Sequence, residues 1–373
     1  MKVALELQPL YWERSGIGTY TYEIAKRLKS DDSVEFVGNA FDFQGKAGLR
    51  PIEDLSMPVL VNKFLPYGVY RRIWNRIPVT YSQMFPEAEL NVFFNFVVPP
   101  RIKGRVMTTV HDLTYLKYPE TMKKANYDHL RKGMPYSMKR SDKVLTVSQF
   151  SKREIQKLLD VPEDKIAVVY NAPSISLNKV DFETLKKKFS IKQNYLLFVG
   201  NIEPRKNISR LLRAFELLKK RTGISHQLVI AGGKGWQNEK IFDEAAKIHC
   251  KHDVIFTGYV SAEEKNTLYE NASAFVFPSL YEGFGIPPLE AMTWGCPVVC
   301  AEAASLPEVV GNAACMVDPQ SFESIADGME KVLNDDEYRI ALIHNGYLRA
   351  KFFTWENSAC QFTNVCKEIL EVN

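Results

Sequence analysis

Two glutamates, Glu282 and Glu290, stand eight positions apart in the segment YEGFGIPPLEAM, residues 281–292. The strand-like run SAFVFPS precedes them, and two glycines and a Pro-Pro pair lie between them. A strand, a glycine turn and a helix start together place backbone N–H groups and a helix N-terminus against anionic ligands in α/β proteins. Because proline suits the first helical turn, we expect Glu290 just inside a helix and Glu282 on the preceding loop.

This segment offers two kinds of contact to a ligand. The two carboxylates can accept hydrogen bonds from hydroxyl groups, and the backbone N–H groups of Phe284, Gly285 and Ile286 can donate to an anion. The structural alternative is an acidic first turn that stabilises a helix N-terminus. That alternative accounts for Glu290 but leaves Glu282 and the two glycines without a reason.

A basic pair, Arg205 and Lys206, lies in VGNIEPRKN after the apolar run YLLFVG. An arginine fork and a lysine point charge suit a diphosphate and can neutralise it as a leaving group. Charged loop residues are usually solvated, but this pair stands where a strand ends and a helix begins. The sequence therefore favours an anion site here.

The front half contains two further candidates. Gly16 and Gly18, in SGIG after the first apolar run, permit positive φ and close backbone approach. The third glycine of a dinucleotide fingerprint is missing, so a glycine turn without a ligand is an equal alternative. His111 ends the run RVMTTV and is followed by Asp112; it could donate to a sugar hydroxyl or a developing charge, or serve only in a turn.

These candidates need elements to position them, and strand-like runs alternate with helical stretches along the chain as in parallel β/α units. A length of 373 residues suits two domains. We predict an α/β fold in which two Rossmann-like domains with parallel sheets, residues 1–172 and 195–353, face a central cleft. Residues 173–194 form a linker with one short helix, and 354–373 a helix that crosses back to the first domain. The predicted strands are KVALEL, SVEFVG, NVFFNF, RVMTTV, KVLTVS and IAVVYN, then YLLFVG, HQLVIAG, VIFTGY, AFVFPS, PVVCA and ACMVD.

The composition, with 46% hydrophobic and 25% charged residues, is that of a soluble protein. No apolar run approaches the roughly 20 residues of a membrane-spanning helix, and the N-terminus, interrupted by Glu6, reads as a strand and not as a signal peptide. The net charge of +4 hides a basic front half and a slightly acidic back half. Only the front half is expected to meet an anionic surface, and no motif indicates nucleic-acid binding.

All six cysteines lie from Cys250 onward without a C-x-x-C pair, which indicates reduced thiols in a cytosolic protein. His249, Cys250 and His252 form a small cluster without further ligands at suitable spacing, so we predict no metal site. Residues 63–76, KFLPYGVYRRIWNR, mix basic and aromatic side chains as a membrane-surface segment does. An acceptor-binding loop or the edge of a domain core are equal alternatives for that segment.

Together these motifs resemble the family-four retaining glycosyltransferases, which have a two-Rossmann B-type fold. The resemblance covers nearly the whole chain and rests on SGIGTY, VHDL, TVSQFSKREI, GNIEPRKN, residues 257–292 and GCPVVCAEAASLPEVVG. It implies that residues 1–172 form the acceptor domain and 195–353 the nucleotide-sugar domain. Many members carry an arginine where this chain has Asn201, so the diphosphate would rest on the basic pair alone. By the resemblance, Glu282 contacts the donor sugar, Glu290 contacts the ribose, and Arg205 and Lys206 bind the diphosphate. Gly16 and Gly18 lie near the donor phosphates and the acceptor, and His111 approaches the transferred sugar.

The variant with E-P-R-K-N is similar to bacterial O-antigen and capsule mannosyltransferases. The resemblance implies hexose transfer with retention from a nucleotide sugar, first GDP-mannose, to a glycan or polyprenyl-linked acceptor. No cofactor or metal is expected, because no Asp-x-Asp motif is present and cationic side chains bind the diphosphate. We expect a cytoplasmic enzyme, peripheral on the inner face of the membrane. The alternatives are a sugar-nucleotide epimerase of the same fold, a glycan phosphorylase with a pyridoxal-bearing lysine, and a non-catalytic nucleotide-sugar-binding subunit.

Overall fold

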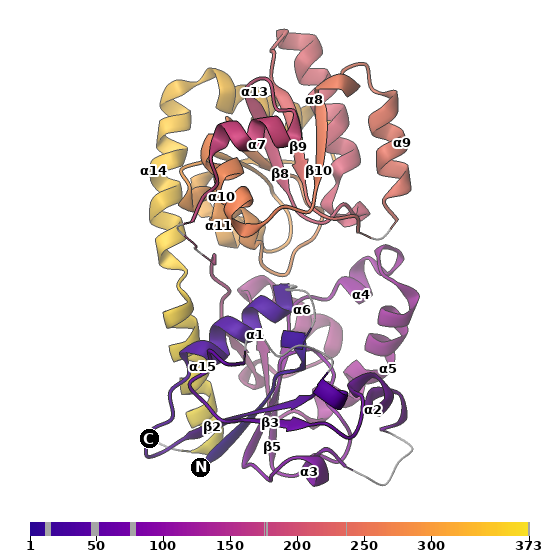
Figure 1. Ribbon diagram of the computed structural model, residues 1–373, viewed down its shortest axis with the longest axis vertical. Helices are drawn as coiled ribbons and strands as arrows, with labels where there is room; N and C mark the ends of the chain where they lie inside the picture. Colours follow the sequence, from indigo (N-terminus) through magenta and orange to yellow (C-terminus); the bar gives the residue numbers. More distant parts are fainter. Residues whose placement is uncertain are drawn as a thin grey trace. The chain divides into compact units, whose positions relative to one another are not determined.

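The computed structural model describes residues 1–11, 16–45, 52–74, 80–174, 176, 178–235 and 237–371. The chain forms two compact units (Figure 1). Unit 1 consists of Met1–Tyr115, Lys124–Asn171 and Thr354–Asn373. Unit 2 consists of Leu116–Lys123 and Ala172–Phe353.

Unit 1 contains a seven-stranded parallel sheet in the order β3-β2-β1-β4-β5-β6-β7. All six strands predicted for the front half are present, and β3 was missed because it is a short, half-exposed edge strand. The bounds are β1 Lys2–Glu6, β2 Glu35–Phe41, β3 Val59–Asn62, β4 Leu90–Phe93, β5 Arg105–Val110, β6 Lys143–Thr146 and β7 Ile166–Val168.

The helices of unit 1 connect these strands, and the last helix of the chain joins them. They are α1 Gly16–Arg27, α2 Tyr67–Ile73, α3 Tyr81–Met84, α5 Lys124–Arg140, α6 Gln149–Leu159 and α15 Trp355–Leu370, with α4 Thr114–Lys117 at the boundary of the units. Short 3₁₀ turns are η1 Gln8–Tyr11, η2 Phe43–Gly45, η3 Pro119–Thr121 in unit 2, and η4 Glu163–Lys165.

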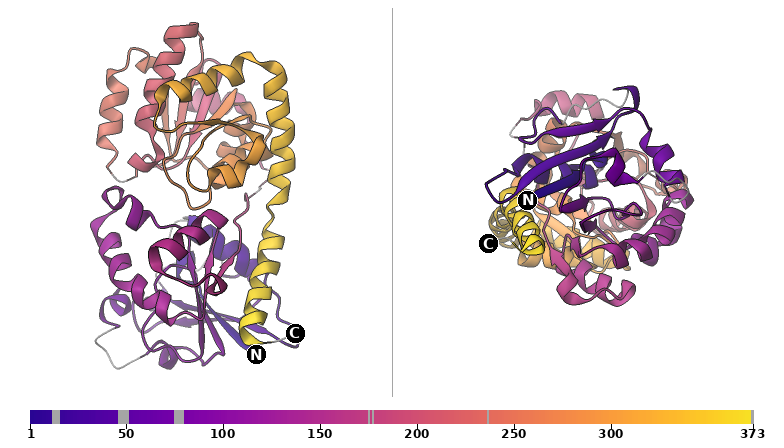
Figure 2. Two further views of the ribbon diagram at one scale, coloured as in Figure 1. Left: turned by 180° about the vertical axis from the view of Figure 1, so that it is seen from behind. Right: turned by 90° about the horizontal axis from the view of Figure 1, so that it is seen from below.

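The C-terminal helix α15 completes the core of unit 1. Thr354 caps it by accepting a hydrogen bond from the backbone N–H of Asn357 at 3.2 Å. The helix runs beside α1 (Figures 1 and 2). The fully buried Phe362 ring stacks on Phe94 with centroids 5.7 Å apart. Residues from the two ends of the sequence therefore share one hydrophobic core.

Unit 2 contains a six-stranded parallel sheet in the order β10-β9-β8-β11-β12-β13, and all six are the predicted strands. Most of its strand residues are buried, as expected for a parallel sheet covered on both faces. The bounds are β8 Tyr195–Val199, β9 Gln227–Ala231, β10 Val254–Gly258, β11 Ala274–Phe277, β12 Val298–Ala301 and β13 Ala314–Val317.

Helices surround the sheet of unit 2, with α8 packed on α13 and α11 packed on α14 (Figure 1). The short helix α7, predicted for the linker, is part of this unit. The bounds are α7 Phe182–Phe189, α8 Ile208–Thr222, α9 Glu239–Lys247, α10 Ala262–Asn271, α11 Ile286–Thr293, α12 Leu306–Val310, α13 Phe322–Asn334 and α14 Asp336–Phe352, with η5 Pro204–Lys206, η6 Lys251–Asp253 and η7 Gly311–Ala313.

Each sheet contains one position where the strand order reverses. In unit 1 the chain moves outward from β1 to β3 and returns to β4 on the other side of β1. In unit 2 it moves from β8 to β10 and returns to β11 beside β8. Ligands of open α/β sheets bind at the carboxyl ends of the strands at such a reversal, so each unit has one topologically favoured site.

Candidate functional site

The loops that follow β8 and β11 meet at the reversal in unit 2. Arg205 and Lys206 lie on η5 after β8, and Glu282 lies on the loop after β11. The β8 loop passes against the end of β9, where a Cβ on Gly232 would lie 2.0 Å from the Gly200 carbonyl oxygen. Only glycine fits Gly232, which also has a φ of +152°. The topology thus brings three predicted site residues to one place.

These three side chains form a closed ionic cluster. One Nη atom of Arg205 donates to Glu282 Oε2 at 2.9 Å, and Lys206 Nζ donates to Glu282 Oε1 at 2.6 Å. All three side chains are 15% exposed or less. Burial alone would raise the pKa of Glu282, but the two cations outweigh it and lower that pKa to about 2. Glu282 is therefore an ionised acceptor throughout the neutral pH range.

Neighbouring groups hold the two cations in place. The other Nη of Arg205 donates to Glu203 Oε1 at 2.8 Å, and the first also donates to the Tyr281 carbonyl. Lys206 Nζ lies 5.1 Å from the centre of the Phe277 ring, within cation–π range. Hydrogen bonds therefore hold both Nη atoms of the Arg205 guanidinium, and this fixed orientation suits bidentate recognition of phosphate oxygens.

Two polar residues that were not predicted as site residues hold these loops in place through hydrogen bonds. Asn207 adopts a left-handed φ of +62°, and its amide donates to the carbonyls of Pro278 and Pro319 at 3.0 and 2.7 Å. The fully buried Ser305 hydroxyl lies 2.8 Å from the Phe284 and Glu282 carbonyl oxygens, and shares its proton between them. Asn207 is the residue before α8, but its side chain makes no capping hydrogen bond to that helix.

The predicted start of a helix at the Pro-Pro pair is confirmed. α11 begins at Ile286, with Gly285 as N-cap at a φ of +107°. A Cβ at Gly285 would lie 2.5 Å from a Leu306 methyl, so both the backbone conformation and the space require glycine. The Phe284 side chain is buried, and its ring packs edge-on against Phe353.

Glu290 belongs to a second cluster, between α10 and α11. Lys265 Nζ donates to Glu290 Oε1 at 2.6 Å, and the hydroxyl of the fully buried Tyr269 donates to Oε2 at 3.2 Å. Each carboxylate oxygen therefore has one donor. Sequence reasoning missed Lys265 and Tyr269, because their contact with Glu290 is formed between two helices and leaves no local signal. Asn201, the position of the departure from the family pattern, is exposed at the end of β8.

The remaining predicted site residues lie in unit 1. Gly16 and Gly18 are in the first turn of α1, and neither has positive φ, so the predicted glycine turn is not at these residues. Ser15 of the same motif lies outside the described residues. His111 is buried at the end of β5, with Nε2 2.8 Å from the Phe94 carbonyl oxygen and the Tyr20 ring packed edge-on against it. Burial lowers the pKa of His111, so the imidazole is neutral and donates to Phe94.

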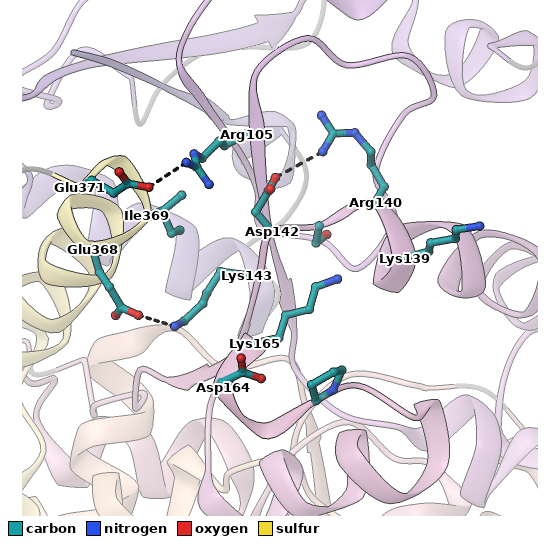
Figure 3. A pocket seen from close by; sticks show the side chains of 12 residues that line it. Arg105, Lys139, Arg140, Asp142, Lys143, Asp164, Lys165, Glu368, Ile369 and Glu371 are labelled. Atoms are coloured by element: carbon teal, nitrogen blue, oxygen red, sulfur yellow. Dashed lines mark hydrogen bonds and ion pairs between the residues drawn. The ribbon is translucent and has the colours of Figure 1, made fainter.

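A cavity of about 500 Å³ lies elsewhere in unit 1, near the amino-terminal ends of β5, β6 and β7 (Figure 3). The described residues that line it include none of the predicted site residues, and it is at the sheet edge opposite to the one where ligands bind. Its charges largely pair with one another and attach the end of α15. The pairs are Lys143–Glu368 at 2.6 Å, Arg105–Glu371 at 3.1 Å and Arg140–Asp142 at 3.3 Å.

Two negative findings hold for the part of the chain that the structure describes. There, no group of three or more His, Cys, Asp or Glu side chains could hold a metal ion. Among the same residues, no helix is long and apolar enough to cross a membrane.

Comparisons with known proteins decide the family. The glycosyl transferases group 1 profile matches residues 181–349, and the Glycosyltransferase Family 4 profile matches residues 14–175. O-antigen chain mannosyltransferase B of Escherichia coli is 32% identical over 98% of this chain and 100% of its own length. The chain belongs to glycosyltransferase family 4. O-antigen chain mannosyltransferase RfbU of Salmonella typhimurium is 35% identical over 62% of each protein.

The fold of this glycosyltransferase agrees with that identification. The structure of Anabaena HepE in complex with UDP and glucose matches with a TM-score of 0.74 at 18% identity, covering 99% of this chain and 100% of that one. At this identity the likeness shows the fold alone. The predicted fold class, α/β with two parallel-sheet domains of the B type, is confirmed.

Proposed function

We propose that this glycosyltransferase transfers mannose from GDP-mannose, with retention, to a glycan or polyprenyl-linked saccharide. The observation that carries the proposal is the cluster in which Arg205 and Lys206 both bind Glu282 at the reversal of the unit 2 sheet. The names of the mannosyltransferase relatives support mannose as the hexose.

The cluster supports an exchange of anions when the donor binds. A diphosphate attracts Arg205 and Lys206 more strongly than one carboxylate does, because it carries more charge and more acceptor oxygens. The cations then turn to the diphosphate, and the Glu282 oxygens become free to accept hydrogen bonds from sugar hydroxyls. Before binding, the same cations are neutralised by Glu282, which keeps the buried charges compensated.

The reaction needs no covalent intermediate. The bond between the sugar anomeric carbon and the phosphate oxygen breaks, and its electron pair leaves on the diphosphate. Arg205 and Lys206 stabilise that developing charge, so we expect no requirement for a divalent metal. The acceptor oxygen attacks on the face that the phosphate leaves, and the acceptor proton passes to a phosphate oxygen of GDP. In this scheme Glu290 contacts the ribose and the N-terminus of α11 binds the diphosphate. His111 approaches the transferred sugar, and Gly16 and Gly18 lie near the donor phosphates and the acceptor.

A nucleotide screen tests the donor. Nucleotide binding raises Tm through mass action, so GDP should shift Tm more than UDP, ADP or CDP at equal concentration. Product analysis by NMR should then give an α-linked mannoside from the α-linked donor, with turnover unchanged by EDTA. A β-linked product overturns retention, and preference for another nucleotide overturns GDP-mannose.

Peripheral membrane binding through unit 1 remains part of the proposal, in a narrower form. Of residues 63–76, Tyr70 and Trp74 are buried core residues, whereas Phe64 is 91% exposed. Lys63 and Arg72 are also exposed, and Arg76 lies outside the described residues. The surface that could meet anionic lipid is therefore Phe64 with its basic neighbours. Sedimentation with vesicles containing phosphatidylglycerol at low salt tests this, and Phe64→Asp should reduce the bound fraction.

A further inference from the structure

The reversal in the unit 1 sheet carries polar side chains with atoms that have no hydrogen-bond partner among the described residues. Glu6 is the last residue of β1, and Asn39 is its neighbour in register on β2. They are 4% and 1% exposed. Glu6 Oε1 and both polar atoms of the Asn39 amide have no hydrogen-bond partner among the residues that the structure describes. Buried polar groups of this kind are rare in native proteins and require an explanation.

Neither residue is satisfied by its nearest polar neighbours. The Glu6 carboxyl interacts with the Gln8 backbone N–H, but this leaves Oε1 without a donor. The Tyr81 hydroxyl lies near both Glu6 and Asn39, but the Asn39 amide makes no hydrogen bond of ordinary geometry with it. Burial raises the pKa of Glu6 to about 8, a perturbation that is common at functional sites.

Aromatic rings enclose this polar pair. Phe41, at the end of β2, lies 5.6 Å from the Tyr67 ring, 5.2 Å from the Tyr70 ring and 6.4 Å from the Tyr81 ring, measured between centroids. Phe93, the residue opposite Glu6 on β4, lies 5.4 Å from Tyr81. Aromatic walls with a few placed hydrogen-bonding groups are the composition of a small-molecule site. A sugar ring, with apolar C–H faces and hydroxyl edges, matches both parts of that composition.

The position of the cluster agrees with this composition. Glu6 and Phe93 end the two strands between which the order of the sheet reverses. The cover over the cluster comes from α2 and α3, and the seven-residue α2 begins after Pro66 without a side-chain cap. Tyr67, in the first turn of α2, is only half-buried. Tyr67 is therefore the most exposed of the rings around the polar pair.

We propose that Glu6 and Asn39, with the surrounding rings of Phe41, Tyr67 and Tyr81, form a binding site for one sugar unit of the acceptor. This inference rests on the proposed function, because it assigns the acceptor side of the same transfer. The sugar hydroxyls supply the hydrogen bonds that the protein does not, and the rings pack on its C–H faces. Unpartnered polar atoms that reduce stability are expected where binding requires them.

Two buried asparagines provide a matched test. The Asn91 amide, on β4, donates to the Ala88 and Lys103 carbonyls, whereas the Asn39 amide has no partner within the described ranges of the chain. Asn91→Ala should lower Tm and leave the KM for the acceptor unchanged. Asn39→Ala should keep Tm at or above that of the wild type and raise the acceptor KM roughly tenfold, the loss expected for one or two hydrogen bonds.

Glu6 variants extend the test to the second polar group. Glu6→Gln keeps a neutral hydrogen-bonding side chain and should retain the acceptor KM within about twofold, whereas Glu6→Met should raise it roughly tenfold. The acceptor probe is α-linked mannotriose with GDP-mannose as donor. Binding of mannotriose without donor, followed by thermal shift, gives a readout that does not depend on the transfer reaction.

The outcomes separate this inference from the proposed function. If Asn39→Ala and Glu6→Met bind mannotriose as the wild type does, the polar pair is not an acceptor site and the inference is wrong. If the wild type binds mannotriose but neither GDP nor GDP-mannose, the donor assignment fails and the acceptor site stands. Unchanged GDP binding in each variant shows that unit 2 remains folded.

Discussion

Each unit has a buried glutamate near the reversal of its sheet, Glu6 at the end of β1 and Glu282 on the loop after β11, and the two carboxyl groups have opposite properties. Glu282 in unit 2 has a cation on each oxygen, and these ion pairs lower its pKa to about 2 against the effect of burial. Glu6 in unit 1 has no cation among the described residues that contact it, and burial raises its pKa to about 8. One carboxyl is ionised at neutral pH and the other holds its proton.

This difference matches what each site is proposed to bind. A charged diphosphate needs mobile cations, and a glutamate that neutralises them keeps the empty site stable. An uncharged acceptor sugar needs hydroxyl-matching groups in apolar surroundings, where a neutral carboxylic acid and an amide serve better than an ion pair. The same topological position is thus adapted to an anion in one unit and to a neutral ligand in the other.

The largest effect should come from removing a cation of unit 2. Arg205→Ala or Lys206→Ala should lower kcat/KM for mannosyl transfer by about 10²–10³-fold, because each loses a group that stabilises the leaving diphosphate. Arg213→Ala, an exposed position on α8, is the matched control and should retain wild-type kinetics. Retention of more than a tenth of the activity in both cluster variants would contradict the diphosphate assignment.

The pH dependence of stability should show the opposite signs directly. The stabilisation from Glu282 is complete above its usual pKa of 4.5 and is lost as pH falls toward 2. The stabilisation that goes with protonated Glu6 is complete below 4.5 and is lost as pH rises through about 8. Each group contributes a slope of at most about 1.4 kcal/mol per pH unit.

Urea unfolding between pH 3 and pH 9 measures both slopes. Glu282→Gln should reduce the slope of the unfolding free energy against pH on the acid side, and Glu6→Gln should reduce it on the alkaline side. The exposed Glu35→Gln should change neither slope. The groups coupled to Glu6 are Tyr67 and Tyr81, and burial raises their own pKa values well above 10, so they stay neutral in this range. Equal slopes in the wild type and Glu6→Gln would show that Glu6 titrates normally.

A third experiment asks whether Glu282 competes with the donor for the cations. Glu282→Gln should bind GDP roughly tenfold more tightly than the wild type while losing turnover, because Arg205 and Lys206 are no longer neutralised. Isothermal titration calorimetry measures the GDP affinity, and the exposed Glu183→Gln is the control. Weaker GDP binding in Glu282→Gln would mean that the carboxylate orients the cations and does not compete for them.

The smallest effect should come from the residues that hold Glu290. Lys265→Met should weaken GDP binding about fivefold, because the carboxylate loses one of its two donors and its fixed position. The same variant should bind 2′,3′-dideoxy-GDP as the wild type does, since that nucleotide has no ribose hydroxyls to contact Glu290. Lys240→Met, on exposed α9, is the control. Equal losses for both nucleotides would remove Glu290 from the ribose site.

Much of the fold could be predicted from sequence, because parallel strands buried on both faces are continuous apolar runs. All twelve predicted strands are present, and the helix start at the Pro-Pro pair follows from local chemistry. The strand β3 was missed since four half-exposed residues at a sheet edge carry too little apolar pattern. Gly16 and Gly18 were misplaced in a turn, because a glycine in a first helical turn has the same sequence signal.

The sequence predicted which loops form the candidate site but not how their side chains pair. The basic pair and Glu282 lie after predicted strands, so topology brings them together, but the sequence does not show that they bind one another. The pairing of Lys265 with Glu290 and the unpartnered state of Asn39 depend on how separate elements pack. Glu6 reads in the sequence only as a polar interruption of the first strand.

The place of α15 has a consequence for synthesis of the chain. Phe94 lacks its stacking partner until Phe362 leaves the ribosome, after all of residues 172–353. At roughly 5–20 residues per second this is a delay of about ten to forty seconds. Unit 1 is therefore synthesised first but completed last. During that interval the nascent chain exposes the apolar surface that α15 later covers, and we expect chaperones to bind there.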